Sequence, residues 1–234
     1  MKKVLIGGIG NVLLGDDGVG PYVARLLTAH YEFEEGVEIA DLGTPALDLI
    51  DQLSGKDAVI LIDSINTEAT PGTVVLYRKA DIMRHCPAVR MDPHSPALVD
   101  ALLSAELFGV APADVLLLGI EAKSFDVGCS LSTPVRASLE EAIAQVLNEL
   151  DRLSVDYRWR KHPAGPDIWW ATDETAESPL VSWTRAPSHP YAGSFAAATT
   201  ACPKLKPPSP DGTSLWVNTS NPTSDSRASS RCDK

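Results

Sequence analysis

The side chains that could do chemistry in this sequence are two carboxylates and an imidazole, far apart along the chain. Asp17 lies near the end of a glycine-rich stretch, Gly7–Gly20. Asp63 ends an apolar run, and His94 lies just before the Ser95-Pro96 dipeptide. Carboxylate oxygens and an imidazole nitrogen, with room for water, make a site for hard to borderline metal ions. The spacing alone leaves other roles open: a helix-dipole partner for Asp17, a cap or turn former for Asp63, and a capping or core histidine for His94.

The glycine-rich stretch is typical of a turn between a strand and a helix. The short, β-branched run before it predicts a buried strand, and the apolar residues after it recur at helical spacing. Glycine is needed where the backbone takes a positive φ or passes close to another segment. Asp16 and Asp17 then stand at the start of the helix, where partial positive charge favours ionised carboxylates. We expect Asp16 to cap this helix or to support the neighbouring site.

Four other chemistries lack the residues that they need. Gly8 and Gly10 begin a dinucleotide fingerprint, but its third glycine position is Leu13. Gly10 and Gly15 have the spacing of a phosphate loop, but acidic residues follow where lysine and a hydroxyl residue are required, and they would repel phosphate. The serine hydrolase and zinc protease motifs, Gly-x-Ser-x-Gly and His-Glu-x-x-His, do not occur.

Charge and composition narrow the partners and the compartment. The chain of 234 residues carries a formal charge of −11, and residues 1–150 alone carry −12. An acidic domain disfavours nucleic acid as a partner and favours a metal cation or a basic protein segment. No apolar run approaches the ~18 residues of a membrane span. Because the N-terminus also lacks the apolar core of a secretory signal, we expect a cytoplasmic protein.

The elements that must position these side chains alternate between strand and helix patterns. Apolar runs predict strands, and Ser/Thr-Pro openings followed by apolar residues at helical spacing predict helices. The predicted strands are 4–6, 37–40, 58–62, 73–77 and 115–119, and the predicted helices begin near residues 21, 44, 95 and 132. This pattern predicts a three-layer α/β fold, with a twisted, mostly parallel sheet of about five strands and helices on both faces. Ligands of such sheets bind beyond the carboxyl ends of the strands, where Asp17, Asp63 and His94 are expected.

The chain changes character after residue 153. All five tryptophans and ten of the 18 prolines lie in residues 154–234. No apolar period continues there, and serine, threonine and proline are frequent. We therefore interpret residues 1–153 as the folded domain and residues 154–234 as an irregular or disordered tail.

Several segments, in order and spacing, resemble the hydrogenase maturation endopeptidases, which process the large subunit of nickel-iron hydrogenases. Gly8–Gly20 is similar to the N-terminal signature of that family. The other similar segments are Asp41-Leu42-Gly43-Thr44, Val59–Ser64, Pro93-His94, Leu118–Glu121 and Leu131–Val135. The resemblance covers residues 4–152, which is the whole of the predicted domain.

The resemblance implies a phosphorylase/hydrolase-like α/β fold and a nickel-dependent, aspartic-type or metal-assisted endopeptidase. Such an enzyme removes the C-terminal peptide of the large-subunit precursor after nickel insertion. The metal-contacting and catalytic positions of the family correspond to Asp17, Asp63 and His94. The nickel is carried by the precursor rather than by the enzyme, and other divalent cations can occupy the site.

Further candidates, for the wall of the substrate cleft, are Asp16, Asp41, Gly43 and Thr44, with capping or packing as alternative roles. Two other functions stay open at this point. One is a non-cleaving chaperone or metal-sensing module for the same precursor, since the motifs do not separate sensing from cleavage. The other is a nucleotide-binding α/β domain, which the acidic turn disfavours.

Overall fold

A five-stranded sheet is the centre of the computed structural model, which describes residues 1–45, 48–85 and 98–170. Its order is β3-β1-β4-β6-β5. The strands are β1 (Val4–Ile9), β3 (Val37–Gly43), β4 (Ala58–Ile65), β5 (Val74–Arg78) and β6 (Asp114–Glu121). β1 is parallel to β3 and β4, and β4 is parallel to β6, whereas β5 is antiparallel to β6. The predicted mostly parallel sheet is therefore confirmed.

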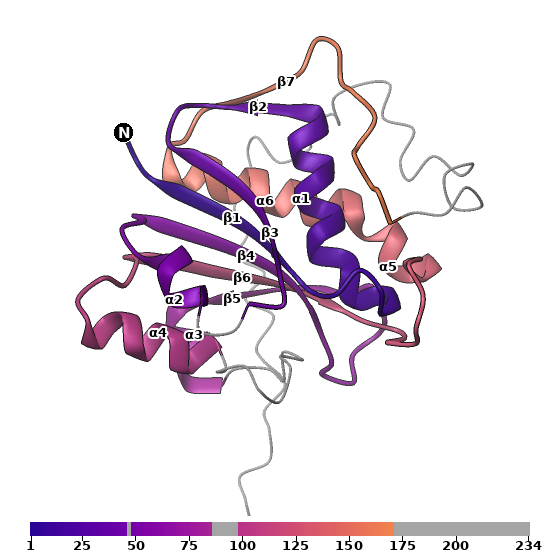
Figure 1. Ribbon diagram of the computed structural model, residues 1–234, viewed down its shortest axis with the longest axis horizontal. Helices are drawn as coiled ribbons and strands as arrows, with labels where there is room; N and C mark the ends of the chain where they lie inside the picture. Colours follow the sequence, from indigo (N-terminus) through magenta and orange to yellow (C-terminus); the bar gives the residue numbers. More distant parts are fainter. Residues whose placement is uncertain (46–47, 86–97, 171–234) are drawn as a thin grey trace, which may run out of the picture. The chain divides into compact units, whose positions relative to one another are not determined.

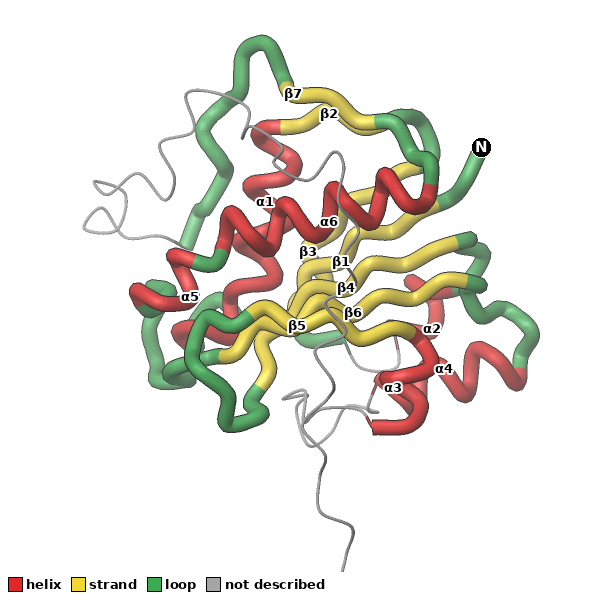
Figure 2. Tube along the Cα trace, turned by 180° about the vertical axis from the view of Figure 1, so that it is seen from behind, coloured by secondary structure: helices red, strands yellow, loops and turns green. Residues whose placement is uncertain are grey.

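Helices cover both faces of this sheet (Figure 1 and, from behind, Figure 2). One face carries α1 (Val19–His30) and α6 (Leu139–Leu153). The other face carries α2 (Asp48–Leu53), α3 (Lys79–His85) and α4 (Leu98–Leu107). Two short helices, η1 (Gly15–Gly18) and α5 (Thr133–Ala137), precede α1 and α6. The predicted three-layer α/β arrangement is thus present.

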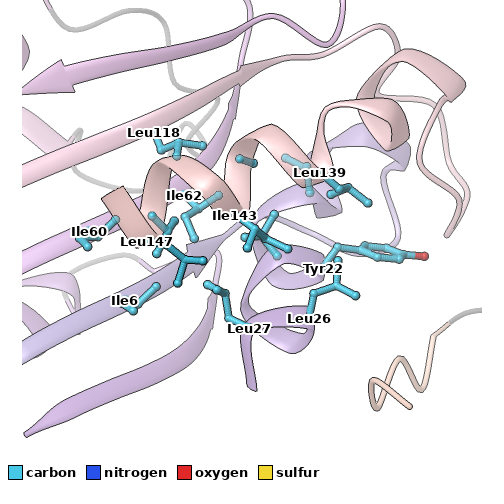
Figure 3. Close-up of a cluster of buried hydrophobic side chains, with 14 of the residues drawn as sticks. Ile6, Tyr22, Leu26, Leu27, Ile60, Ile62, Leu118, Leu139, Ile143 and Leu147 are labelled. Atoms are coloured by element: carbon cyan, nitrogen blue, oxygen red, sulfur yellow. The ribbon is translucent and has the colours of Figure 1, made fainter. Parts of the chain in front are cut away.

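The two faces of the sheet bury separate hydrophobic clusters. Because successive residues of a strand point to opposite faces, β4 supplies Ile60 and Ile62 to one cluster and Val59 and Leu61 to the other. Burial on both faces explains why this strand is a continuous apolar run in the sequence. Figure 3 shows the first cluster, in which side chains of α1 and α6 pack on the sheet, among them Tyr22, Leu26, Leu27, Leu139, Ile143 and Leu147.

The last helix and the central strand β4 differ from the predicted elements. The helix expected from residue 132 is divided into α5 and α6 at Ser138, whose hydroxyl and backbone amide both donate to the carbonyl oxygen of Val135. These local bonds compete with a continuous helix. Strand β4 does not end at Asp63 but continues to Ile65, so the carboxylate belongs to the strand rather than to the following loop.

Pairing and packing continue beyond residue 153, the predicted end of the folded domain. A second, two-stranded sheet pairs β7 (Tyr157–Trp159) antiparallel to β2 (Tyr31–Phe33). Val155 and Trp170 are buried in the same cluster as α1 and α6. The Trp170 ring meets Tyr22 edge-on, with 5.3 Å between the ring centroids. Large aromatic rings bury much apolar area, so Trp170 and the partly buried Trp159 extend the core.

Some sequence predictions fall outside the described residues. These are residues 171–234 of the predicted tail, and His94 with the predicted helix start at Ser95-Pro96. Within the described ranges, no helix combines the length and the apolar character needed to cross a membrane.

Candidate functional site

The turn between β1 and α1 lies close against the carboxyl end of the sheet because glycine occupies its contact points. A Cβ on Gly20 would lie 2.3 Å from the carbonyl oxygens of both Ile9 and Ile62. Gly10 has a φ of 135°, and a Cβ there would overlap the carbonyl oxygen of Asp17. A side chain at either position would push the turn away from the strands. The glycines therefore bring Asp17 next to β4.

Asp17 and Asp63 lie beside each other at this edge, joined through Ser64. Asp17 is 5% exposed and Asp63 is 1% exposed. The Ser64 hydroxyl donates to Asp17 Oδ1 at 2.9 Å, and the Ser64 backbone amide donates to Asp63 Oδ1 at 2.7 Å. The Asn11 amide donates to Asp17 Oδ2 at 2.9 Å. Two of the three predicted metal-contacting residues are thus brought together, and the third, His94, lies outside the described residues.

One oxygen of this pair has no hydrogen-bond partner among the described residues. It is the buried Oδ2 of Asp63. Burial raises the pKa of Asp63 well above its usual range, and the charge of Asp17 raises it further, although the Ser64 amide lowers it. A divalent cation fits such a pair, because it would neutralise the repulsion between the carboxylates and supply the missing partner.

Asp16, the neighbour of Asp17, has a different role. It is 1% exposed and accepts hydrogen bonds from the amides of Lys123 and Ser124 and from the amide and hydroxyl of Ser132, at 2.6–3.1 Å. It does not cap α1, which was one of the roles expected from the sequence, because its oxygens are occupied by the loop between β6 and α5. Asp16 instead ties this loop to the turn that carries Asp17.

Two residues outside the predicted site set, Ser64 and Glu121, are also buried at the carboxyl ends of β4 and β6. Glu121 is 2% exposed and accepts hydrogen bonds from the amide and hydroxyl of Thr67, which fixes the connection after β4. The sequence feature that could have indicated Glu121 is an acidic residue directly after the apolar part of β6. The signal for Ser64 was a second polar residue after Asp63, followed by the apolar Ile65, which indicates that the strand continues.

The residues predicted for the cleft wall, Asp41, Gly43 and Thr44, lie at the carboxyl end of β3. The Gly43 carbonyl oxygen accepts the Gly10 amide at 2.7 Å, so this end adjoins the turn that carries Asp17. The Asp41 carboxylate accepts the Gly43 amide at 3.1 Å and faces Arg25 at 3.8 Å. A pocket of about 360 Å³ beside them is lined by Glu38, Ala40, Asp41, Leu42, Thr44, Pro45, Asp48 and Gln52.

In the parts of the chain that the structure describes, no three His, Cys, Asp or Glu side chains form a cluster that could hold a metal ion. What the geometry defines is an α/β protein with a buried, incompletely bonded carboxylate pair at the carboxyl edge of its sheet. Two other buried carboxylates, Asp16 and Glu121, have a hydrogen-bond donor on each oxygen, and these donors belong to loop residues. One buried oxygen of the pair, Oδ2 of Asp63, is left without a hydrogen-bond partner among the described residues.

Comparison with known proteins identifies the family. A family model described as hydrogenase maturation protease matches residues 21–149. The hydrogenase expression/formation protein HupM of Azotobacter chroococcum is 37% identical over 146 residues, which are 62% of this chain and 70% of the relative. The hydrogenase 2 maturation protease of Escherichia coli K12 is 30% identical over 158 residues, which are 66% of this chain and 94% of the relative. The chain belongs to the hydrogenase maturation protease family, a family of peptidases.

Solved structures agree with this assignment. The hydrogenase maturating endopeptidase HybD from E. coli superposes with a TM-score of 0.63 and 29% identity, covering 68% of this chain and 98% of that chain. The hydrogenase 2 maturation peptidase from a Thaumarchaeota archaeon gives a TM-score of 0.50 and 31% identity, covering 64% and 99%. Almost the full length of each neighbour is matched, so the fold predicted from the resemblance is confirmed.

Proposed function

We propose that this protein is an endopeptidase that removes the C-terminal peptide of a nickel-iron hydrogenase large-subunit precursor, in the cytoplasm and after nickel insertion. The observation that carries the proposal is the buried Oδ2 of Asp63, beside Asp17, which has no hydrogen-bond partner among the described residues. The chain belongs to the hydrogenase maturation proteases, and a site of this kind is suited to recognise a metal ion within a protein substrate.

In the proposed reaction, the nickel ion is part of the substrate. Asp17, Asp63 and His94 contact it and thereby position the peptide bond to be cleaved. The ion supplies Lewis acidity that polarises the peptide carbonyl. One of the two carboxylates accepts a proton from the attacking water as general base.

The same electrostatics give a reason for selecting the nickel-loaded precursor. Without a cation, the charges of Asp17 and Asp63 repel each other in a poorly solvated site. A precursor that lacks nickel leaves this repulsion uncompensated. A loaded precursor relieves it, so binding is favoured after metal insertion has finished.

Mass spectrometry of the hydrogenase precursor, with and without this protein, tests the proposal. We expect loss of the terminal peptide from nickel-loaded precursor only. Asp17→Ala, Asp63→Ala and His94→Ala should each slow cleavage by at least about 100-fold. A matched control is Asp51→Ala, which removes an exposed carboxylate on α2 and should leave cleavage unchanged.

Two results would contradict the proposal in different ways. A loaded precursor that is bound but keeps its full mass would indicate the non-cleaving chaperone or metal-sensing module instead. Unimpaired cleavage by all three site variants would show that nickel docking on these side chains is not part of the reaction.

A further inference from the structure

Ser64 makes a hydrogen bond to each of the two acidic side chains of the site. Its hydroxyl donates to Asp17 Oδ1 at 2.9 Å, and its backbone amide donates to Asp63 Oδ1 at 2.7 Å. The residue is 1% exposed, so bulk water does not compete for these bonds. The two bonds have different chemical origins, and replacing the side chain removes only the one to Asp17.

The hydroxyl fixes the plane of the Asp17 carboxylate. Each oxygen of Asp17 receives one donor, the Asn11 amide on Oδ2 and the Ser64 hydroxyl on Oδ1. One donor belongs to the glycine-rich turn and the other to β4, so together they orient the carboxylate relative to both. An ionised carboxylate has about four acceptor positions, and the remaining ones stay available to a cation. With the Asn11 bond alone, the terminal torsion of the side chain, which is intrinsically broad, would be less restricted.

We propose that Ser64 is a positioning residue that holds the Asp17 carboxylate so that Asp17 and the free Oδ2 of Asp63 present oxygens to one divalent cation, the nickel ion of the precursor. This inference rests on the proposed function and extends it to a residue outside the predicted metal-contacting set. Ser64 does not itself contact the ion, and its effect passes through Asp17.

The test compares Ser64→Ala with Ser138→Ala, a matched control. Ser138 is also buried, and its hydroxyl also makes one hydrogen bond, to the Val135 carbonyl oxygen at 2.8 Å. The affinity of each full-length protein for Ni²⁺ is measured by titration calorimetry, and cleavage of loaded precursor is measured in parallel. Ser64→Ala should weaken Ni²⁺ binding and lower kcat/KM roughly ten- to hundredfold, as loss of a residue that orients a metal ligand does. Ser138→Ala should change neither.

Two further variants separate positioning from general packing. Ser64→Thr keeps the hydroxyl and should recover much of the Ni²⁺ affinity lost in Ser64→Ala. In an Asp17→Ala background, Ser64→Ala should cause no further loss, because the hydroxyl then has no carboxylate to orient. If Ser64→Ala does not fold, Ser64→Cys, whose thiol is a weak donor of similar size, should give an intermediate affinity.

The outcomes distinguish this inference from the proposed function. If wild-type protein does not cleave loaded precursor, the proposed function fails, and Ni²⁺ affinity alone decides the role of Ser64. If wild-type protein cleaves and Ser64→Ala matches it in affinity and kcat/KM, the inference about Ser64 fails alone. Independent, multiplying losses from Asp17→Ala and Ser64→Ala, or no Ni²⁺ binding by wild-type protein, also count against it.

Discussion

Replacing Asp16 or Asp17 by alanine separates a carboxylate that stabilises the fold from one that is available to a ligand. The two residues are adjacent in η1, and both are buried. Asp16 accepts four hydrogen bonds, three of them from backbone amides of the loop that leads to α5. Asp17 accepts two, and its charge lies beside that of Asp63.

The expected magnitudes differ accordingly. A hydrogen bond to a charged group contributes about 1.5–3 kcal/mol, but such bonds are not additive and water can reach part of this loop. We therefore expect Asp16→Ala to lower the free energy of unfolding by about 3–5 kcal/mol. Asp17→Ala loses two bonds but also removes a buried charge that repels Asp63, so its net cost should stay below about 2 kcal/mol.

Urea denaturation of both variants, followed by circular dichroism, measures this difference. The m-value serves as a control, since an unchanged slope shows that the same surface is exposed on unfolding. We expect precursor cleavage to be lost in Asp17→Ala although the protein remains folded. Equal destabilisation of the two variants, within about 1 kcal/mol, would refute the distinction drawn from their hydrogen bonds.

Two further predictions concern the rest of the fold. Burial raises the pKa of Glu149, but Arg152 and Arg78 lower it overall below its usual 4.5. The contribution of ionised Glu149 to the free energy of unfolding is therefore complete above pH 4.5 and is lost as the pH falls through the lower folded-state pKa. Glu149→Gln should make the free energy of unfolding, measured by urea denaturation at a series of pH values, fall less steeply in acid. An unchanged pH slope would contradict this. Trp170→Ala should lower the free energy of unfolding, measured by urea denaturation, by about 3–5 kcal/mol because Trp170 is 4% exposed. Trp169 is 68% exposed, so Trp169→Ala should lower it by less than about 1 kcal/mol. Equal losses would argue against the packed position of Trp170.

The central strands could be predicted because their sequence and their environment agree. Residues 58–62 are apolar without interruption, as required of a strand that is covered on both faces. The glycine-rich turn could be predicted equally well, since most of its glycines lie directly against backbone atoms, and Gly20 lies against those of β1 and β4. Sequence spacing also pointed to Asp17 and Asp63 at one edge of the sheet, where the structure has them.

Other features could not be read from local patterns. Strand β2 has three residues and follows α1 without a turn, and its partner β7 is so distant in sequence that no local period relates them. The roles of Asp16 and Asp17 were not separable either, because both are aspartates in the same turn. What distinguishes them is the set of donors that each side chain meets, and for Asp16 those donors come from a loop more than 100 residues later.

The pairing of Tyr31 with Trp159 has a consequence for the order in which the chain can acquire its structure. A chain emerging from the ribosome presents β2 long before β7 has been synthesised, and domains begin to fold from their N-terminal part during synthesis. Until residues 157–159 appear, β2 lacks the strand that pairs with it in the described structure. The ring contacts of Tyr31 with Trp159 and of Tyr22 with Trp170 accordingly form late in biosynthesis, after all five strands of the main sheet have been made.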